Sequence, residues 1–225
     1  MDPVAQQEAL EIAKYLLAAL PPQVEGRTAI VEMRDGGSRH WKQMEWIGFY
    51  VEYIVEARVR REVGAKQGPM RQNTRFDLQL TRVWDLKAHP VSVPTSPLND
   101  QVAIRECIRD YGGVGFVILE VDAEYDESGE FKKWHDELKG DRSRYEDERV
   151  ARGAPSRRRK VAFRPMLVTA IYLSSESDIQ DGLAEGWLSE FQTGMRNSDG
   201  TPRRAKFAIS PNRVPSKYIA VQVRY

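Results

Sequence analysis

The sequence is poor in the residues that build disulfide frameworks and transition-metal sites. It has one cysteine, Cys107, and three widely separated histidines among 225 residues. A single cysteine excludes an intramolecular disulfide framework and a multi-cysteine zinc site, and we expect Cys107 to be a buried helix residue. No apolar run approaches the roughly 20 residues that a membrane-spanning helix needs. The amphipathic N-terminal segment does not resemble an export signal. We therefore expect a cytoplasmic protein with no membrane partner.

Charge, in contrast, is abundant and unevenly distributed. The 34 lysines and arginines nearly balance the 33 aspartates and glutamates, so that the formal net charge is +1. Residues 120–150 hold twelve acids and six bases, whereas residues 151–164 hold six bases and no acid. Residues 192–225 add seven bases against one acid. This asymmetry indicates a basic face for a polyanion on an otherwise balanced protein.

The first half of the chain predicts alternating helices and strands. Helical spacing of apolar residues ends at Pro21, and a second proline-free helical pattern covers residues 41–63. Strands are expected within residues 26–37 and over 75–80, 82–88 and 114–123, the last apolar enough to be covered on both faces. Residues 89–100 read as a loop, after which Asn99 or Asp100 caps a helix that ends at Gly112.

The second half continues in the same manner. We expect short helices within residues 125–140 and 143–151, a basic loop up to residue 160, a strand over 163–173 and a helix over 176–194. Strands over 203–210 and 218–225 complete the chain. The sequence thus predicts a single elaborated α/β domain, residues 1–225, with a mixed central sheet flanked by helices. Its core would be residues 41–122, with the strands, helix and basic loops of 140–225 as C-terminal elaborations for recognition.

The segment "FDLQLTRVWDLKAH", residues 76–89, places charged residues in a stretch that otherwise reads as sheet. Asp85 and Lys87 are two residues apart, so they share one face of a strand, and Asp77 would meet them from the neighbouring strand. A cross-strand ion pair on a surface hairpin is the simplest alternative. That alternative gives no reason for Asp85 on an apolar strand.

Two neighbouring carboxylates repel each other unless a cation lies between them. Carboxylate and carbonyl oxygens suit Mg²⁺, so we expect Asp77, Asp85 and the backbone carbonyl of Leu86 as its ligands. Such a cation polarises a phosphodiester and activates water. Lys87 would stabilise developing negative charge or orient the attacking water.

This order of residues resembles the PD-(D/E)xK nuclease superfamily. Its core has the order helix, three strands, helix, strand, with the first acid near the start of the second strand and the D/E-x-K triplet on the third. "FDLQL" supplies Asp77, and "WDLK" supplies Asp85 and Lys87. The resemblance covers roughly residues 41–122, with Phe76 in place of the proline in the family's name. It implies a restriction-endonuclease-like fold, a magnesium cofactor and hydrolysis of double-stranded DNA.

The segment "WIGFYVEYIVE" is similar to a helix that brings an additional catalytic, metal-coordinating glutamate to some of these nucleases, particularly the mismatch-repair strand-nicking endonuclease and its restriction-enzyme relatives. Glu52 occupies the matching position. Glu56 is one helical turn on and Glu45 lies on nearly the same face, so both stay open as alternatives. His89, which shares the strand parity of Lys87, could orient a water, and Asp122 with Glu124 could form a second hard-metal site. For these last residues, a solvated strand end and a solvated acidic loop are the simpler interpretations.

Two basic segments are candidates for DNA binding, in which phosphate contacts dominate affinity. Arginine and asparagine side chains also match guanine and adenine edges in the major groove. The candidates are Arg157, Arg158, Arg159 and Lys160 in the first segment, and Arg196, Asn197, Arg203 and Arg204 in the second. A solvated basic turn is the alternative for each.

The resemblance as a whole implies a magnesium-dependent, site-specific type II restriction endonuclease. Cleavage of both strands requires two active sites, for which a homodimer on a palindromic site is the simplest arrangement. The alternatives are a partner-dependent nicking endonuclease of the mismatch-repair type and a nucleic-acid-binding module without catalysis. The oligomeric state distinguishes the first, and the effect of Asp85→Ala distinguishes the second.

Overall fold

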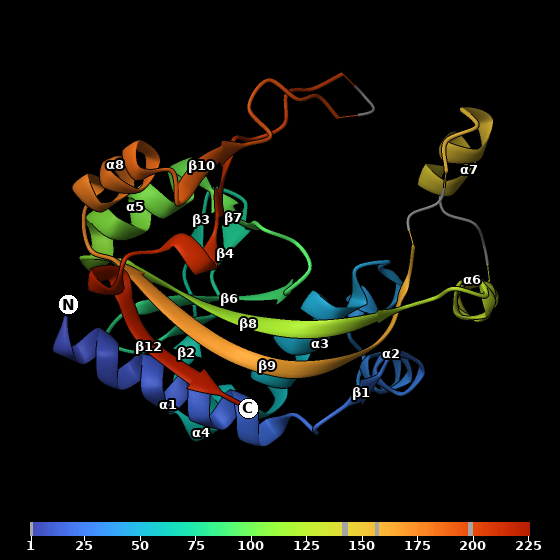
Figure 1. The fold of residues 1–225 in the computed structure, drawn as a ribbon, viewed down its shortest axis with the longest axis horizontal. Helices are drawn as coiled ribbons and strands as arrows, with labels where there is room; N and C mark the ends of the chain where they lie inside the picture. The colour runs from blue at the N-terminus through green and yellow to red at the C-terminus, as the bar shows by residue number, and fades with distance from the viewer. Residues whose placement is uncertain (1, 141–143, 156–157, 198–199) are drawn as a thin grey trace.

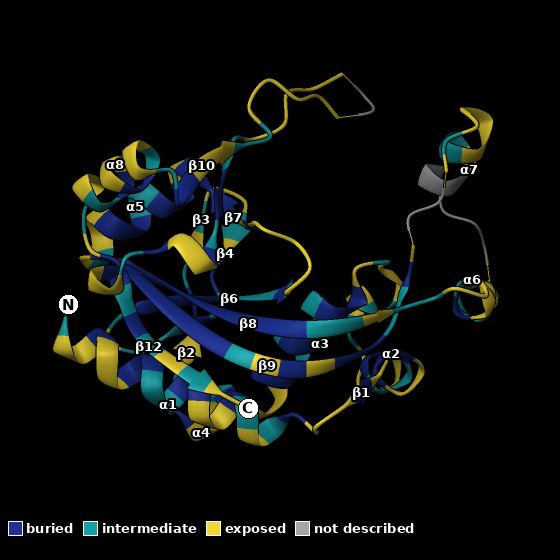
Figure 2. Ribbon diagram, viewed as in Figure 1, coloured by how far each residue is buried: buried dark blue, intermediate teal, exposed yellow. Residues whose placement is uncertain are grey.

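The computed structural model describes residues 2–140, 144–155, 158–197 and 200–225, without the side chains of residues 144–146. The described chain is a mixed α/β structure in which helices flank a curled sheet (Figure 1). Strands β8 (Val114–Tyr125) and β9 (Lys160–Leu173) form the long middle of this sheet, and Figure 2 shows that much of both is buried. The expected mixed central sheet with flanking helices is therefore confirmed.

The main sheet of the described residues has seven strands, of which one neighbouring pair is parallel. Their order is β1-β9-β8-β6-β5-β2, and β12 also pairs with β9. The pair β6–β8 is parallel, as a connection through a helix permits, and the other pairs are antiparallel. The remaining strands are β1 (Val24–Glu25), β2 (Lys66–Gln67), β5 (Leu78–Gln79), β6 (Val83–Pro90) and β12 (Ile219–Arg224).

The parallel pair is fitted closely around Trp84. Gly115 lies opposite Trp84 in the strand register, and a Cβ atom on Gly115 would lie 2.1 Å from the indole ring. Any larger residue would displace the ring, so glycine is required here. The indole Nε1 donates to Glu8 at 2.8 Å. Packing and hydrogen bonding therefore fix the position of Trp84, the residue immediately before Asp85.

A smaller sheet joins the end of the chain to the segment that follows β6. Its order is β10-β11-β7, with β10 (Leu188–Phe191), β11 (Lys206–Ile209) and β7 (Ser96–Asp100) all antiparallel. The prediction of a loop over residues 89–100 was therefore wrong for its last five residues, and also for its first two, which belong to β6. β11 pairs with them from a distant part of the sequence, which local propensity does not reveal. A separate hairpin consists of β3 (Met70–Arg71) and β4 (Thr74–Arg75).

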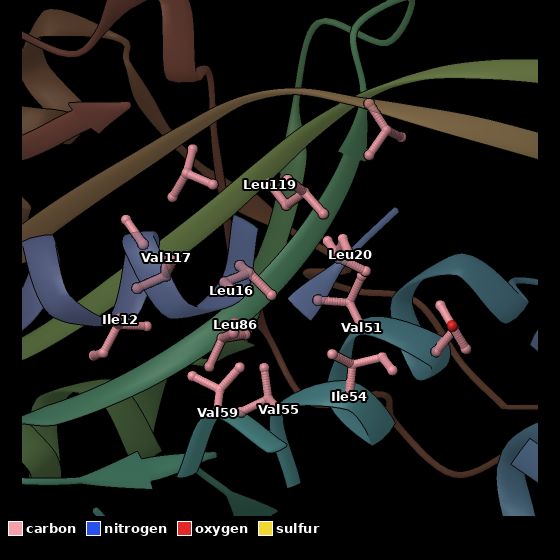
Figure 3. Packing of buried hydrophobic residues seen from close by; sticks show 14 of the residues in the cluster. Ile12, Leu16, Leu20, Val51, Ile54, Val55, Val59, Leu86, Val117 and Leu119 are labelled. Carbon is pink, nitrogen blue, oxygen red and sulfur yellow. The ribbon is translucent and has the colours of Figure 1, made fainter. Parts of the chain in front are cut away.

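One face of the main sheet is covered by α1 (Pro3–Ala19) and α3 (Trp46–Ile54), the latter continued by the π-helical turn η2 (Val55–Val59) and α4 (Arg60–Glu62). Figure 3 shows apolar side chains of α1, α3 and η2 gathered against Leu86 of β6 and Val117 of β8. Asp2 caps the N-terminus of α1, because its side chain accepts from the Val4 N–H at 2.9 Å, and the helix ends before Pro21. None of the described helices is long and apolar enough to cross a membrane.

The other face is covered by α5 (Gln101–Tyr111), α8 (Glu176–Glu185) and the smaller sheet. Asp100 caps α5, because its side chain accepts from the N–H groups of Val102 and Ala103 at 3.0 and 3.3 Å. Gly112 ends the helix with a φ of 70°. Both signals were predicted. Cys107 is buried in α5, as expected, and burial raises the pKa of its thiol to about 12.

Two further sequence-based assignments were wrong. Residues 26–35 form helix α2 (Gly26–Asp35) and not a strand, because Ala29, Ile30 and Met33 supply a helical apolar stripe. The helix expected over residues 176–194 ends at Glu185, since Gly186 adopts a φ of 72° and the next residues pair with β11. The remaining elements are η1 (Arg39–Lys42), α6 (Glu130–Lys139), α7 (Arg144–Ala151), η3 (Pro211–Arg213) and η4 (Ser216–Tyr218).

Candidate functional site

Asp85 and Lys87 extend from one face of β6, as strand parity predicts. The Asp85 side chain is 2% exposed and forms an ion pair with the Lys87 ammonium, which keeps 20% of its exposure. Oδ2 of Asp85 is the oxygen that faces the Lys87 ammonium, and no further donor bonds to it among the described residues. A carboxylate has about four lone-pair sites, so one ammonium leaves others unused. The Asp85 carboxylate can therefore also accept a cation.

Asp77 reaches the same place from a bend and not from the middle of a strand. The strand expected over residues 75–80 is reduced to β5, and Asp77 lies just before it. The Asp77 backbone N–H donates to the Trp84 carbonyl at 3.1 Å, and its Oδ2 accepts from the Leu86 N–H at 2.6 Å. The bend replaces one rung of the strand pairing by a side-chain hydrogen bond. In this way Asp77 is fixed across the edge of β6 from Asp85.

The same hydrogen bond orients the backbone of Leu86. In a strand, the N–H and C=O of one residue point to the same side. Because the Leu86 N–H points toward Asp77, the Leu86 carbonyl lies on that edge as well. β5 pairs with β6 only as far as Trp84, so the ladder does not continue to Leu86. The carbonyl predicted as a ligand thus faces the Asp77 side of the strand.

Asn99 is a site residue that the sequence reasoning missed. The Lys87 ammonium donates to Asn99 Oδ1 at 3.0 Å, and Asn99 is 9% exposed. Asn99 was predicted only as a possible helix cap, a role that Asp100 fills. Its other amide atom, Nδ2, is buried without a hydrogen-bond partner among the described residues. The only sequence signal was a polar residue in the segment before α5.

Glu52 is the one of the three candidate glutamates that lies near this cluster. It belongs to α3, which packs against β6, and its charge interacts with Lys87 and Asp85. Glu45 is exposed and pairs with Lys160, while Glu56 is exposed and pairs with Arg60. The π-helical turn η2 follows Glu52 closely, a feature often found next to functional sites. The structure therefore brings Glu52, and not Glu45 or Glu56, to Asp85 and Lys87.

Three carboxylates around one ammonium leave the cluster short of positive charge. Burial raises the pKa of Asp77 well above its ordinary value, and the neighbouring Asp85 and Glu52 carboxylates add to this effect, against Lys87 and the Leu86 N–H. Burial likewise raises the pKa of Glu52, with Asp85 adding to the effect and Lys87 opposing it. Both carboxyl groups therefore hold protons more tightly than exposed ones do. A cation would relieve the repulsion that causes this.

The same cluster raises the pKa of Lys87, which keeps this residue charged. Burial alone would lower the pKa of its ammonium, but the Asp85 and Asp77 carboxylates outweigh burial and raise the pKa above the ordinary value. Lys87 is consequently charged at neutral pH and cannot act as a base in this state. Its chemistry is that of a fixed positive charge beside the carboxylates.

These residues fit a hard cation in part. The described residues contain no group of three or more His, Cys, Asp or Glu side chains placed to hold one metal ion together. What they contain is the carboxylates of Asp77 and Asp85 and the Leu86 carbonyl on the strand that carries Asp85. Mg²⁺ is commonly bound by one or two carboxylates and keeps several waters. The donor set therefore suits a partly hydrated Mg²⁺ better than a cation that needs a full set of protein ligands.

The second basic segment lies on a loop that projects between β10 and β11 (Figure 1). Arg196 donates to the Gly200 carbonyl at 2.7 Å and Asn197 Nδ2 donates to Thr201 Oγ1 at 3.0 Å, so both side chains also stabilise their own turn. Arg203 and Arg204 are exposed. A surface hollow of about 400 Å³ is lined by Gln192, Asn197, Pro202, Arg203, Arg204 and Lys206.

The first basic segment is engaged by acidic partners. Arg157 lies outside the described residues. Arg158 pairs with Glu127, Lys160 pairs with Glu45, and the buried Arg159 lies 3.8 Å from Asp136. These contacts stabilise the ends of β8 and β9. Binding of DNA by this segment stays a prediction.

The remaining candidates make other contacts. His89 is buried opposite Glu120 of β8, and burial lowers the pKa of its imidazole. Asp122 pairs with Arg164 at 2.8 Å, and Glu124 is exposed. Neither acid belongs to a metal-binding group among the residues that the structure describes.

Comparisons with known proteins give no assignment. No protein-family model matches the chain, and no curated protein or solved structure is similar enough to count as a match. The function must therefore be argued from the site itself.

Proposed function

We propose that this protein is a magnesium-dependent endonuclease that hydrolyses phosphodiester bonds in double-stranded DNA, with the core of a PD-(D/E)xK nuclease. The observation that carries the proposal is the buried Asp85–Lys87 pair on β6, with Asp77 fixed across the strand edge and Glu52 alongside. A stability role does not account for this arrangement. Structural carboxylates are normally satisfied by donors, whereas these repel one another.

The order of elements supports the same assignment. Helix α3 precedes the strands β2, β5 and β6, helix α5 follows, and β8 then pairs in parallel with β6. This agrees with the order helix, three strands, helix, strand of the superfamily. Asp77 precedes β5, and Asp85 and Lys87 belong to β6.

Each residue then has a defined task. Asp77, Asp85 and the Leu86 carbonyl would hold Mg²⁺, with Glu52 as a further ligand directly or through water. When bound, the cation would polarise the phosphodiester and lower the pKa of a bound water. Lys87, kept charged by the acids and oriented by Asn99, would place its ammonium against the negative charge that develops on the phosphate. Asn99 is therefore a positioning residue.

Site-specific cleavage of both strands by a homodimer, as in a type II restriction endonuclease, is the favoured form of this activity. The loop between β10 and β11 and the segment at residues 158–160 supply basic side chains from two places on the chain. The placement of Glu52 also favours a second candidate, a nicking endonuclease of the mismatch-repair type. A dimer in solution supports the first, and a monomer that nicks supports the second.

The test is cleavage of supercoiled plasmid and long phage DNA with Mg²⁺ or with EDTA. We expect discrete fragments with Mg²⁺ only, and their loss in Lys87→Ala. Lys14→Ala is the matched control, because Lys14 is exposed on α1, which covers the opposite face of the sheet. Nicking without fragments would favour the second candidate. No cleavage by folded protein on either DNA would contradict the proposal of a self-contained endonuclease.

A further inference from the structure

Lys206 is a half-buried lysine that the proposed chemistry does not use. It begins β11 and lies opposite Asp100 in the strand register. Among the residues that the structure describes, no carboxylate forms a close ion pair with its ammonium and no acceptor bonds to it, although Asp100 and Asp85 act on its charge. Such an ammonium, partly removed from water and without a direct partner, favours an anion.

The backbone around Lys206 is fixed to the start of α5. The Gln101 N–H donates to the Ala205 carbonyl at 3.0 Å, and Gln101 Nε2 donates to the Lys206 carbonyl at 3.1 Å. Asp100 and Gln101 follow Asn99 directly, and Asn99 accepts the hydrogen bond from Lys87. Lys206 is thus held next to the segment that orients the lysine of the proposed active site.

Asn99, the residue before Asp100 in β7, carries a second donor group without a partner in the described part of the chain. Asn99 is 9% exposed, and its Nδ2 has no partner among the described residues although its Oδ1 is occupied by Lys87. Because the amide oxygen faces Lys87, the amide nitrogen faces away from it with two unused donors. A buried donor without an acceptor is costly. An oxyanion would satisfy it.

The surroundings of Lys206 are basic on the side that leads to the projecting loop. Lys206 lines the same hollow as Arg203 and Arg204, and Arg203 has no side-chain partner among the described residues. Burial lowers the pKa of the Lys206 ammonium, and the charges of Lys87 and Arg203 lower it further, against the acids Asp100 and Asp85. Bound phosphate would reduce this repulsion between cations.

We propose that Lys206 and Asn99 form a phosphate-binding site beside the Asp85–Lys87 pair, which holds a second phosphate of the DNA strand and connects the loop at residues 192–205 to the point of cleavage. This site rests on the proposed function in that its ligand is DNA, but it does not require that cleavage occur. Arg203 extends it along the strand.

The test is binding of the full-length chain to a labelled DNA duplex without divalent metal, measured at KCl concentrations from 50 to 200 mM. Each phosphate contact contributes about 0.9 to the slope of log K against log salt. Lys206→Ala is expected to reduce the magnitude of the slope by about 0.9. The loss of affinity between 50 and 200 mM KCl should then be about 3.5-fold smaller than for the wild type. Lys206→Arg should keep the wild-type slope, because it retains the charge.

Two further variants separate this role from a structural one. Lys14→Ala removes an exposed lysine of α1 and should leave the slope unchanged. Asn99→Asp retains an acceptor for Lys87 but replaces the unused donors with an oxygen, so it should weaken DNA binding while the protein stays folded by thermal unfolding.

The outcomes also separate this inference from the proposed function. A lower slope in Lys206→Ala from a protein that does not cleave DNA would support the phosphate site and contradict the nuclease. Magnesium-dependent cleavage together with a wild-type slope in Lys206→Ala would overturn the phosphate site alone. A wild-type protein that does not bind duplex DNA would overturn it as well.

Discussion

Two buried carboxylates lie close to β6, and their surroundings differ in kind. Glu8 of α1 is 8% exposed and accepts three hydrogen bonds, from the N–H groups of Thr81 and Arg82 at 2.8 and 3.1 Å and from Trp84 Nε1 at 2.8 Å. Asp85 pairs with the Lys87 ammonium, and its charge repels the Asp77 and Glu52 carboxylates. Glu8 is satisfied by three N–H donors, whereas Asp85 has a single ammonium as its partner among the described residues.

The difference is consistent with a structural role for Glu8 and, under the proposed function, with a ligand-binding role for Asp85. Glu8 joins α1 to the turn between β5 and β6, and its removal would leave three donors unpaired. Asp85 contributes one ion pair, with Lys87, and its repulsion of Asp77 and Glu52 offsets part of that contribution. Burial, which the two carboxylates share, does not distinguish the two roles. The number of hydrogen-bond donors that each carboxylate receives distinguishes them.

The largest effect is expected for Asp85→Asn. This change keeps the shape of the side chain but removes the charge that would hold Mg²⁺, so cleavage should fall by about a thousandfold or more. The protein should still fold, with a smaller loss of unfolding free energy than Glu8→Ala. DNA cleavage and urea denaturation measure the two quantities. Retained cleavage would show that Asp85 is not a functional carboxylate.

Glu8→Ala should have the opposite profile. Loss of the acceptor leaves three donors without partners, which costs about 3 kcal/mol of unfolding free energy. Cleavage by the folded fraction should stay within about threefold of wild type, because Glu8 does not reach Asp85. Urea titration at low temperature and cleavage assays check this. Glu11→Ala is the control on the same helix, since among the described residues Glu11 accepts a side-chain hydrogen bond only from the exposed Gln7. A loss as large as that of Glu8→Ala would contradict the explanation.

A smaller effect is expected at Glu52. Glu52→Gln should lower cleavage about 10- to 100-fold by weakening metal binding, with the loss partly recovered at high Mg²⁺. Glu56→Gln, which alters an exposed glutamate paired with Arg60, should behave like wild type. Cleavage rates measured against Mg²⁺ concentration distinguish the two. Equal losses in both variants would mean that helix stability, and not the carboxylate of Glu52, matters.

The smallest effect concerns the dependence of stability on pH. Burial is the main reason that the pKa of Asp77 is raised above 3.8. The folded protein therefore binds this proton more tightly than the unfolded chain does. The resulting contribution to the free energy of unfolding is complete below pH 3.8 and is lost as the pH rises through the raised pKa. Asp77→Asn should remove this loss while keeping an acceptor for the Leu86 N–H. Unfolding free energies from pH 4 to 8 test the sign.

Asp136 supplies a control of opposite sign. Burial would raise the pKa of its carboxyl, but Lys132 and Lys139 outweigh burial and lower the pKa below 3.8. Its contribution to stability is therefore present above pH 3.8 and lost as the pH falls below that value. Asp136→Asn should destabilise the protein at neutral pH and not in strong acid. The same trend in both variants would contradict the assigned electrostatics.

The parts of the site that could be predicted were those set by local spacing. Asp85 and Lys87 share a face because a strand repeats every two residues, and Asp100 and Gly112 bound α5 because their chemistry is that of helix caps. The failures arose where the partner is distant in sequence. β7 exists only because β11 pairs with it, and Asn99 reaches Lys87 only after that pairing forms. The helical stripe of α2 was present in the sequence but was taken for a strand.

The sequence by itself determined the α/β class and the shared face of Asp85 and Lys87. These follow from periodicity and side-chain chemistry, which act over a few residues. Tertiary structure alone decided that Glu52 and not Glu45 or Glu56 lies near the cluster, that Glu8 accepts three hydrogen bonds, and that Lys206 lies opposite Asp100. Those decisions depend on which donors and charges the fold brings together in a buried environment, where an unpaired group is costly and a paired one is not.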